Sequence, residues 1–223
     1  MSLFLSRITV SRSPSMQALK ALLNPEDAGQ RTDAHHRLLW SLFADDPERE
    51  RDFLWREERA GEFLTLSARP PEQSDLFSRV EVKPFDPVLA AGDRLHFTLR
   101  ANATIAKKGV GRVDVVMNAL HEIAPSERGE RRMDVAQEQG KAWLERQGAR
   151  CGFAVKECEV ADYSVRTLPT YRGKRKGQPQ FGIIDLLGRI EVTDPEAFRT
   201  AIGDGFGRAK AFGCGLMLIR RAG

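Results

Sequence analysis

Residues 181–202 read FGIIDLLGRIEVTDPEAFRTAI, and this stretch decides the fold that the sequence predicts. Its first part, residues 181–192, is rich in Ile, Leu and Val, which is typical of a strand. Asp194 and Pro195 then give a helix start signal, because a carboxylate caps free N–H groups and proline suits the first helical turn. The stretch therefore predicts a strand followed by a helix that ends near Ile202.

Further elements surround this strand and helix in the second half of the chain. We expect a strand over residues 94–101, where Leu95, Phe97 and Leu99 alternate with other residues. A helix over 136–147, an extended segment over 153–165 and a last strand over 216–220 follow from the same kind of pattern. The second half thus has the order β-α-β-β-α-β, which is that of ferredoxin-like domains.

The first half predicts a similar but less regular series. Residues 3–10 indicate a strand, apolar spacing indicates helices over 16–23 and 34–43, and three more strands are expected over 53–56, 62–67 and 79–83. Thr32 or Asp33 is expected to cap the second helix. Residues 85–92 look like a linker. We therefore predict an α+β protein with two tandem domains, residues 1–90 and 91–223, the first being a distorted copy of the second.

Length and composition limit the classes of protein that remain. The chain has 223 residues, of which 41% are hydrophobic and 30% charged, which suits a globular protein with a substantial core. No apolar run approaches the roughly 18 residues of a spanning helix, and no cationic segment precedes the apolar start as in a secretory signal. The three cysteines are an odd number without metal-like spacing, so we expect reduced thiols in a cytoplasmic protein.

The charge is unevenly divided between the two halves. Residues 1–90 hold 12 Lys and Arg against 15 Asp and Glu, a net charge of −3. Residues 91–223 hold 23 against 16, a net charge of +7. A basic half beside an acidic half favours a polyanionic partner for the basic half, although modestly basic proteins without such a partner are common.

A glycine-rich segment, GDGFGRAKAFGCG at residues 203–215, joins the predicted helix to the last strand. Glycine is costly to order, so this density indicates a close backbone approach, and successive N–H groups beside Arg208 and Lys210 can cradle phosphate. The segment does not have the spacing of a Walker loop. Two alternatives remain: a tight structural turn, and a phosphate site for a small-molecule substrate.

Two basic segments lie between predicted strands or at their ends. Residues 171–176 read YRGKRK and residues 107–112 read KKGVGR. A projecting basic segment is attracted to the phosphates of an RNA duplex, with a strong dependence on salt. For residues 171–176 the alternative is a solvated loop tip that binds nothing.

The adjacent histidines His35 and His36 lie on the predicted helix over residues 34–43. An imidazole with an ordinary pKa near 6.5 can give and take protons at neutral pH. Neighbouring residues point about 100° apart on a helix, so the two side chains cannot easily share one role. Structural roles for both are the alternative. No set of His and Cys residues has the spacing of a zinc site, so we expect no metal and no cofactor.

Five motifs together resemble the CasE family, the CRISPR RNA-processing endoribonucleases of the type I-E Cascade complex within the RAMP superfamily. They are His-Arg-Leu-Leu-Trp at 36–40, Phe-Thr-Leu-Arg-Ala-Asn at 97–102, Lys-Ala-Trp-Leu at 141–144, Gly-Arg-Ile-Glu-Val at 188–192 before Asp194-Pro195, and the glycine-rich residues 205–215. Each motif alone is weakly specific, but five in the family's order cover nearly the whole chain.

The resemblance implies two tandem ferredoxin-like (RRM-like) domains and binding of the hairpin in each CRISPR repeat. It implies metal-independent cleavage of precursor CRISPR RNA at the 3′ base of the stem, which leaves a cyclic phosphate and a 5′ hydroxyl. The cleaved RNA then stays bound, and the protein becomes a Cascade subunit beside the other subunits. By the same matching, His36 is the catalytic histidine, as base or as acid, and residues 172–176 contact the stem.

These considerations give one set of candidate site residues. His36 is the candidate catalytic residue, with His35 and Asp33 as possible helpers, and Lys210 or Arg208 can offset charge that develops on the phosphorane. The candidate RNA-binding residues are Tyr171, Arg172, Lys174, Arg175, Lys176, Arg100, Lys107, Lys108, Arg112, Gly205, Gly207, Arg208, Lys210 and Gly213.

The chain departs from some relatives at one position near His36. Those relatives carry a tyrosine three residues before the catalytic histidine, whereas this chain has Asp33. A role of that tyrosine is therefore not inherited, and Asp33 can act as a helix cap instead. This departure keeps an alternative open, in which the protein is a non-catalytic RNA-hairpin-binding subunit of the same complex.

Overall fold

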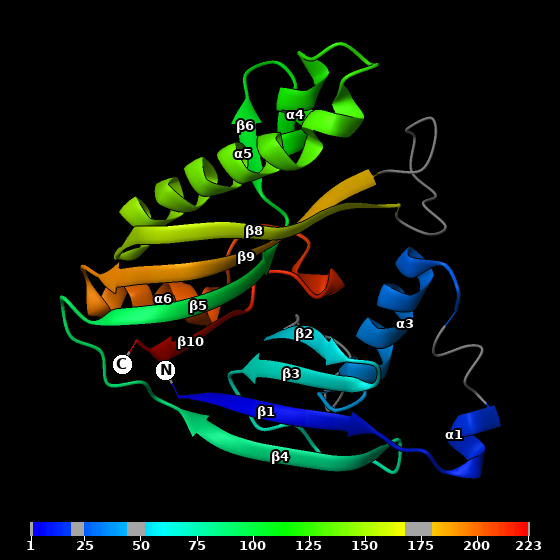
Figure 1. The fold of residues 1–223 in the computed structure, drawn as a ribbon. Helices are drawn as coiled ribbons and strands as arrows, with labels where there is room; N and C mark the ends of the chain where they lie inside the picture. Colours follow the sequence, from blue (N-terminus) through cyan, green and yellow to red (C-terminus); the bar gives the residue numbers. More distant parts are fainter. Residues whose placement is uncertain (1, 19–24, 44–51, 168–179, 223) are drawn as a thin grey trace. The chain divides into compact units, whose positions relative to one another are not determined.

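The computed structural model describes residues 2–18, 25–43, 52–167 and 180–222. By their contacts, these residues divide into two compact units. The first unit contains the described residues up to Asp86, together with Thr167 and Lys210–Gly213, and the second contains the others. Each unit has a four-stranded sheet of its own (Figure 1). The domain boundary expected after residue 90 remains a prediction about where the chain divides into folding domains.

The first unit is built on a four-stranded antiparallel sheet of order β2-β3-β1-β4. Its strands are β1 (Leu3–Val10), β2 (Phe53–Arg59), β3 (Glu62–Ser67) and β4 (Phe77–Phe85). Its helices are α1 (Pro14–Ala18) and α3 (Ala28–Trp40), which precede β2 in the chain. The two central strands pair Ile8 with Phe63, so their apolar side chains share one face.

The core of the first unit lies between α3 and this sheet. Leu38 and Leu39 of α3 are buried with Phe43, just beyond the helix, against Ile8 and Phe63 of the sheet. Phe43 stacks on Phe53 with ring centroids 4.4 Å apart. The apolar spacing that predicted the helix is therefore the face that packs on the sheet.

Helix α3 begins earlier than its apolar pattern predicted. Its N-cap is Asp27, whose carboxylate accepts a hydrogen bond from the backbone N–H of Gln30 at 2.8 Å. The expected cap at Thr32 or Asp33 is wrong, because both residues lie inside the helix. The Thr32 hydroxyl donates to the Ala28 carbonyl, and Asp33 pairs with Arg37. The helix also ends at Trp40 rather than at Phe43.

Residues 68–76 connect β3 to β4 as a loop without a helix. The first unit thus keeps the ferredoxin-like strand order but lacks the second helix in that described connection. Arg69 holds the loop, since its guanidinium donates to Asp52 at 2.7 Å and lies 5.6 Å from the ring centroid of Phe43. The prediction of a distorted copy is confirmed in this form.

The second unit has the complete ferredoxin-like order of strands and helices. Its sheet runs β10-β5-β9-β8, with β5 (Arg94–Ala101), β8 (Phe153–Thr167), β9 (Gln180–Val192) and β10 (Met217–Arg221). The helices α5 (Arg128–Cys151) and α6 (Pro195–Asp204) contact one another. Gly140 of α5 lies against Ile184 and Leu186 of β9. The α+β, ferredoxin-like fold class is therefore confirmed, with the same strand order in both sheets.

An insertion follows β5 in the second unit. It consists of the hairpin β6 (Thr104–Lys107) and β7 (Gly111–Asp114) and the helix α4 (Val115–His121). Asp114 caps α4 by accepting from the N–H groups of Val116 and Met117, and it accepts from the Tyr163 hydroxyl of β8 at 3.0 Å. The basic loop expected at residues 107–112 is the tip of this hairpin. No helix in the described part of the chain is long and apolar enough to cross a membrane.

Candidate active site and nucleic-acid interface

The two neighbouring histidines of α3 have different surroundings. His35 is 6% exposed, with its Nδ1 3.5 Å from Glu57 Oε2 and its ring edge-on to Phe63. Burial lowers the pKa of His35, the Glu57 carboxylate raises it less, and Arg31 lowers it further. Burial, the preference for the neutral form and the contact with the sheet favour a structural role for His35.

His36 lies at the edge of the same core and stays partly accessible. It is half-buried, with its ring centroid 5.9 Å from that of Trp40 and 6.3 Å from that of Phe53. Trp40 follows one turn later on α3, and Phe53 begins β2, so a helix and a strand fix the imidazole's orientation. The ring is therefore oriented, but its Nε2 atom is buried, so a role in proton transfer through that atom requires it to become exposed when RNA binds.

Asp33 and Arg37 form an ion pair one turn apart on α3, with 2.8 Å between Asp33 Oδ2 and Arg37 Nη2. Such pairs support a helix by a few tenths of a kcal/mol. The Asp33 carboxylate is thus engaged along the helix. Its role as a helper of His36 remains a prediction, like that of His35.

The glycine-rich segment is divided between the two units. Residues up to Ala209 belong to the second unit, whereas Lys210–Gly213 belong to the first. The 3-10 helix η1 (Lys210–Phe212) contacts α3 and β2, and the Trp55 indole N–H donates to the Ala211 carbonyl at 3.3 Å. Of the two residues proposed to offset charge on the phosphorane, Lys210 therefore shares a unit with His36, and Arg208 does not.

The asparagine of the Arg-Ala-Asn motif holds the other part of the glycine-rich segment. Its backbone carbonyl accepts from the Arg208 N–H at 3.2 Å, and its buried amide donates to the Gly182 carbonyl at 2.8 Å. Gly207 has a φ of +76°, and a Cβ there would lie 2.7 Å from the Asn102 carbonyl oxygen. Glycine at 207 is therefore required by this close approach, whatever the segment binds.

Four of the candidate RNA-binding residues line one pocket of the second unit. These are Arg112, Gly205, Gly207 and Arg208. Sequence reasoning missed two other residues of the pocket, Gln147 and Arg150, in the last turns of α5. A basic residue just before the helix-ending Gly152 was the available signal, because that glycine, with a φ of +76°, marks the end of the helix.

The remaining candidates are scattered. Arg100 makes two 2.8 Å hydrogen bonds to the Asp185 carboxylate across the sheet, and Lys107 donates to Asn118 of α4 at 2.9 Å. Lys108 is exposed at the tip of the β6–β7 hairpin. Gly213 lies under the Trp55 ring in the first unit. Tyr171, Arg172, Lys174, Arg175 and Lys176 fall outside the described residues.

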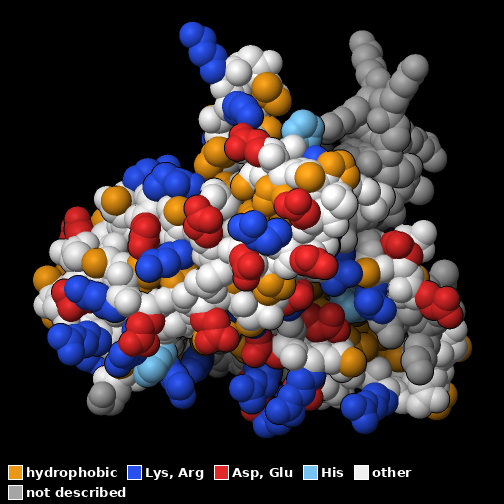
Figure 2. Space-filling view, turned by 45° about the horizontal axis from the view of Figure 1, so that its top comes forward, with side chains coloured by type: hydrophobic (Ala, Val, Ile, Leu, Met, Phe, Trp, Pro, Cys, Tyr) orange, Lys and Arg blue, Asp and Glu red, His pale blue; other side chains and the backbone are white. Residues whose placement is uncertain are grey.

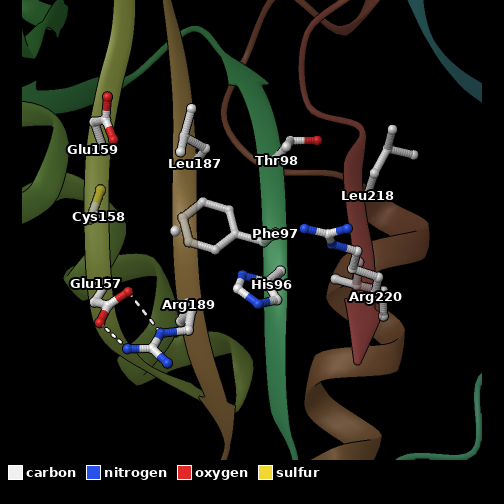
Figure 3. Close-up of a pocket in the computed structure, with 12 residues that line it drawn as sticks. His96, Phe97, Thr98, Glu157, Cys158, Glu159, Leu187, Arg189, Leu218 and Arg220 are labelled. Carbon is white, nitrogen blue, oxygen red and sulfur yellow. Dashed lines mark hydrogen bonds and ion pairs between the residues drawn. The ribbon is translucent and has the colours of Figure 1, made fainter. Parts of the chain in front are cut away.

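A groove runs across the second unit's sheet on the face where His96 and Thr98 of β5 project (Figure 3). Arg189 of β9 makes an ion pair with Glu157 of β8 there, which raises the pKa of Arg189 and lowers that of Glu157. Phe97, the only phenyl ring of the lining, is 2% exposed. The lining of this groove therefore offers the Arg189–Glu157 pair and the His96 imidazole, without the exposed Phe, Tyr or Trp rings on which RRM-like sheets stack bases.

The surface does not carry one uniform basic patch on the face that Figure 2 shows, where Lys and Arg side chains are interspersed with Asp and Glu. On this face, attraction of a polyanion would therefore depend on particular clusters of cations. Within the described ranges, no three His, Cys, Asp or Glu side chains are placed to hold a metal ion.

Comparisons with known proteins agree with this architecture. A family model described as CRISPR associated protein matches residues 3–221. The Thermus thermophilus protein named CRISPR-associated endoribonuclease Cse3 is 28% identical over 227 residues, 92% of this chain and 99% of that protein. The Escherichia coli K12 protein named CRISPR system Cascade subunit CasE is 27% identical over 191 residues, 82% of this chain and 89% of that protein.

Solved structures share the fold over the whole chain. A structure of Cse3 bound to a 19-nucleotide RNA has a TM-score of 0.71 at 24% identity and covers 98% of this chain and 99% of that one. Cas6e from Escherichia coli K-12 has a TM-score of 0.63 at 22% identity, covering 98% and 100%. Because the family model spans nearly every residue, the resemblance found in the sequence is confirmed, and the chain belongs to the CasE family of CRISPR-associated proteins.

Proposed function

We propose that this protein is a CRISPR RNA-processing endoribonuclease. It binds the hairpin of a CRISPR repeat and cuts the precursor RNA at the 3′ base of the stem. Membership of the family and the names of its relatives Cse3 and CasE support this function. The observation that carries it is the contrast on α3, where the His35 ring is buried against Glu57 and the half-buried His36 ring is oriented by Trp40 and Phe53.

The reaction uses a nucleophile that the RNA itself supplies. The 2′ oxygen attacks the adjacent phosphorus, the bond from phosphorus to the 5′ oxygen breaks, and the products are a 2′,3′-cyclic phosphate and a 5′ hydroxyl. One proton leaves the 2′ hydroxyl and one reaches the departing 5′ oxygen. His36 performs one of these two transfers, and the protein aligns the attacking oxygen with the bond that breaks. In this proposal the reaction needs no metal ion.

Lys210 is the better of the two candidates for offsetting charge on the phosphorane. It begins η1, which packs on the helix of His36 and is held by the hydrogen bond from Trp55 to Ala211. That hydrogen bond fixes the backbone that carries Lys210, and a cation on a fixed backbone needs less reorganisation as charge develops in the transition state.

Three further segments bind the RNA. The basic tip of the β6–β7 hairpin, the glycine-rich segment and residues 171–176 contact the stem, mainly through its phosphates and shape. The cleaved RNA stays bound, and the protein remains with it as a subunit of Cascade in the cytoplasm. The alternative is a non-catalytic hairpin-binding subunit of the same complex. It is favoured by Asp33, because its carboxylate pairs with Arg37 and replaces a tyrosine of some relatives.

The test is cleavage of the cognate repeat RNA in excess EDTA by the wild type, by His36→Ala and by the neighbouring variant His35→Gln. We expect wild type and His35→Gln to cut, and His36→Ala to bind without cutting. Cleavage by His36→Ala moves the catalytic role elsewhere, first to His35. Binding without cleavage by all three proteins supports the passive subunit, and loss of cleavage only in EDTA contradicts the metal-free mechanism.

A further inference from the structure

A pocket of about 390 Å³ opens in the second unit where α5 and α6 end. Three arginines from three different elements line it: Arg150 from α5, Arg112 from β7 and Arg208 from the glycine-rich segment. All three side chains are exposed. The pocket contains one carboxylate, that of Asp204 at the end of α6, so cations outnumber anions.

Buried rings and hydrogen bonds fix the residues around the pocket. Trp143 of α5 is 1% exposed and Phe206 is 2% exposed, so buried rings form the floor below the polar rim. Asn102 holds the backbone of Arg208, and the Gln147 amide oxygen accepts from Arg150 Nη2 at 2.7 Å. The cations are thus presented by a rigid base, which lowers the entropic cost of binding an anion.

Stabilisation of the helix ends does not account for this cluster. The carboxyl end of a helix attracts cations, and that effect can explain Arg150 alone. Arg112 lies on a hairpin and Arg208 on the glycine-rich segment, so neither belongs to a helix that ends here. The α5 end is also satisfied by its own cap, in which the Gly152 N–H donates to the Gly148 carbonyl.

We propose that this pocket binds one internal phosphodiester of the RNA, apart from the phosphate that reacts. The proposal rests on the proposed RNA-binding function. Guanidinium groups suit phosphate because they donate two parallel hydrogen bonds. The rings of the floor are buried and offer no stacking surface to a base, so the pocket recognises backbone charge and not base identity. It anchors the RNA in the second unit, while His36 lies in the first.

The test measures binding of a repeat RNA by fluorescence anisotropy between about 50 and 300 mM salt. The RNA has free hydroxyls at both ends, so every phosphate is internal, and a 2′-deoxy residue at the cleavage site prevents cutting. Arg150→Ala is compared with Arg146→Ala, which removes the same charge one turn earlier on α5, outside the pocket. Thermal melting of each variant checks that it folds.

We expect Arg150→Ala to weaken binding about fivefold and to reduce the slope of log K against log salt by about one, as for one lost phosphate contact. Arg146→Ala should leave the slope nearly unchanged. Asp204→Asn should strengthen binding by about threefold, because it removes the carboxylate that repels the phosphate. This gain cannot come from misfolding, so it keeps the test decisive if Arg150→Ala is unstable.

A methylphosphonate scan then locates the phosphate. One neutral linkage should weaken binding to the wild type and have no further effect on Arg150→Ala. Equal effects of Arg150→Ala and Arg146→Ala, or no gain from Asp204→Asn, overturn the pocket and leave a diffuse basic surface. If the wild type binds but does not cut the natural RNA, the nuclease proposal fails while these shifts still support the pocket. Absence of RNA binding overturns both.

Discussion

The two sheets of this protein have the same strand order, but the helices, insertions and candidate functional residues around them differ. The first unit has no helix between β3 and β4 and presents a histidine on α3. The second unit has both helices, an inserted hairpin, and three arginines around one pocket. Strand order alone therefore does not separate a catalytic domain from a binding domain. Under the proposed function, the first unit carries the catalytic residue and the second unit binds the RNA.

Two segments of the glycine-rich stretch follow the same division. Gly207 is placed by Asn102 in the second unit, whereas Gly213 lies under Trp55 in the first. One continuous loop thus contributes Arg208 to the pocket and Lys210 to the unit of His36. Under the proposed function, a loop that belongs to both units would be a covalent link between RNA binding and the reaction.

The largest expected effect tests the catalytic side of this comparison. Replacing His36 with Ala removes the proposed proton-transfer group, and we expect single-turnover cleavage to slow by about 10²–10⁴-fold. Affinity for uncleavable RNA should change by less than about threefold, because phosphate contacts elsewhere dominate binding. Single-turnover rates at saturating protein provide the measurement. A comparable loss of binding would contradict the division of roles.

A change in the second unit should act on stability and binding instead. In Gly207→Val, a β-branched side chain is forced into a φ of +76°, and its Cβ meets the Asn102 carbonyl oxygen. We expect a loss of roughly 2–4 kcal/mol of unfolding free energy, together with weaker RNA binding. Urea denaturation measures the loss.

Gly129→Ala is the matched control for that variant. Gly129 is in the first turn of α5, and a Cβ there meets nothing within 4 Å. Alanine should stabilise the helix by about 0.5–1 kcal/mol. Equal outcomes for the two glycine variants would contradict the close approach at Gly207.

Local patterns in the sequence were sufficient to predict most strands, because alternating apolar residues and β-branched residues reflect a strand with one buried face. Strands β1, β3 and β5 have the predicted bounds. For the helices α3 and α5, the sequence predicted only the turns whose apolar side chains pack against the core. The first turns of α3 and α5, from Ala28 and from Arg128, are mostly polar and carry no apolar period.

The candidate site depended on contacts between distant residues. A helical wheel predicted that His35 and His36 point apart, and they do, but only Glu57 and Phe63 decide that His35 is the buried one. The division of the glycine-rich segment depends on Trp55, which is 156 residues from Ala211. Arg150 joins Arg112 and Arg208 only through the tertiary fold.

A smaller effect is expected where the insertion of the second unit is anchored. Tyr163→Phe removes the hydroxyl that donates to Asp114 at 3.0 Å and leaves the ring. We expect a loss of about 1–2 kcal/mol of unfolding free energy, since a partly buried carboxylate loses a hydrogen bond. Hydrogen exchange should show the loss as faster exchange in α4 and the β6–β7 hairpin. Uniformly faster exchange in the first unit would contradict a local anchor.

The smallest effects are in the pH dependence, where the two units should have opposite signs. Burial lowers the pKa of His35 below its ordinary value of 6.5, so the unfolded state binds its proton first. The stability of the first unit should therefore fall as the pH falls below about 6.5, as the unfolded histidine becomes protonated. Thermal melting of His35→Gln should show a shallower fall over that range than the wild type.

Asp114 should act in the opposite direction in the second unit. Burial raises its pKa above the ordinary value of 3.8, although the N–H groups of α4 and the Tyr163 hydroxyl lower it in part. The folded state therefore keeps this proton to a higher pH than the unfolded state, so its contribution to stability is lost as the pH rises through the folded pKa. Asp114→Asn keeps an acceptor for the α4 cap and removes the titration. If this variant steepened the loss of stability with rising pH above 4, the assignment of sign to the second unit would be wrong.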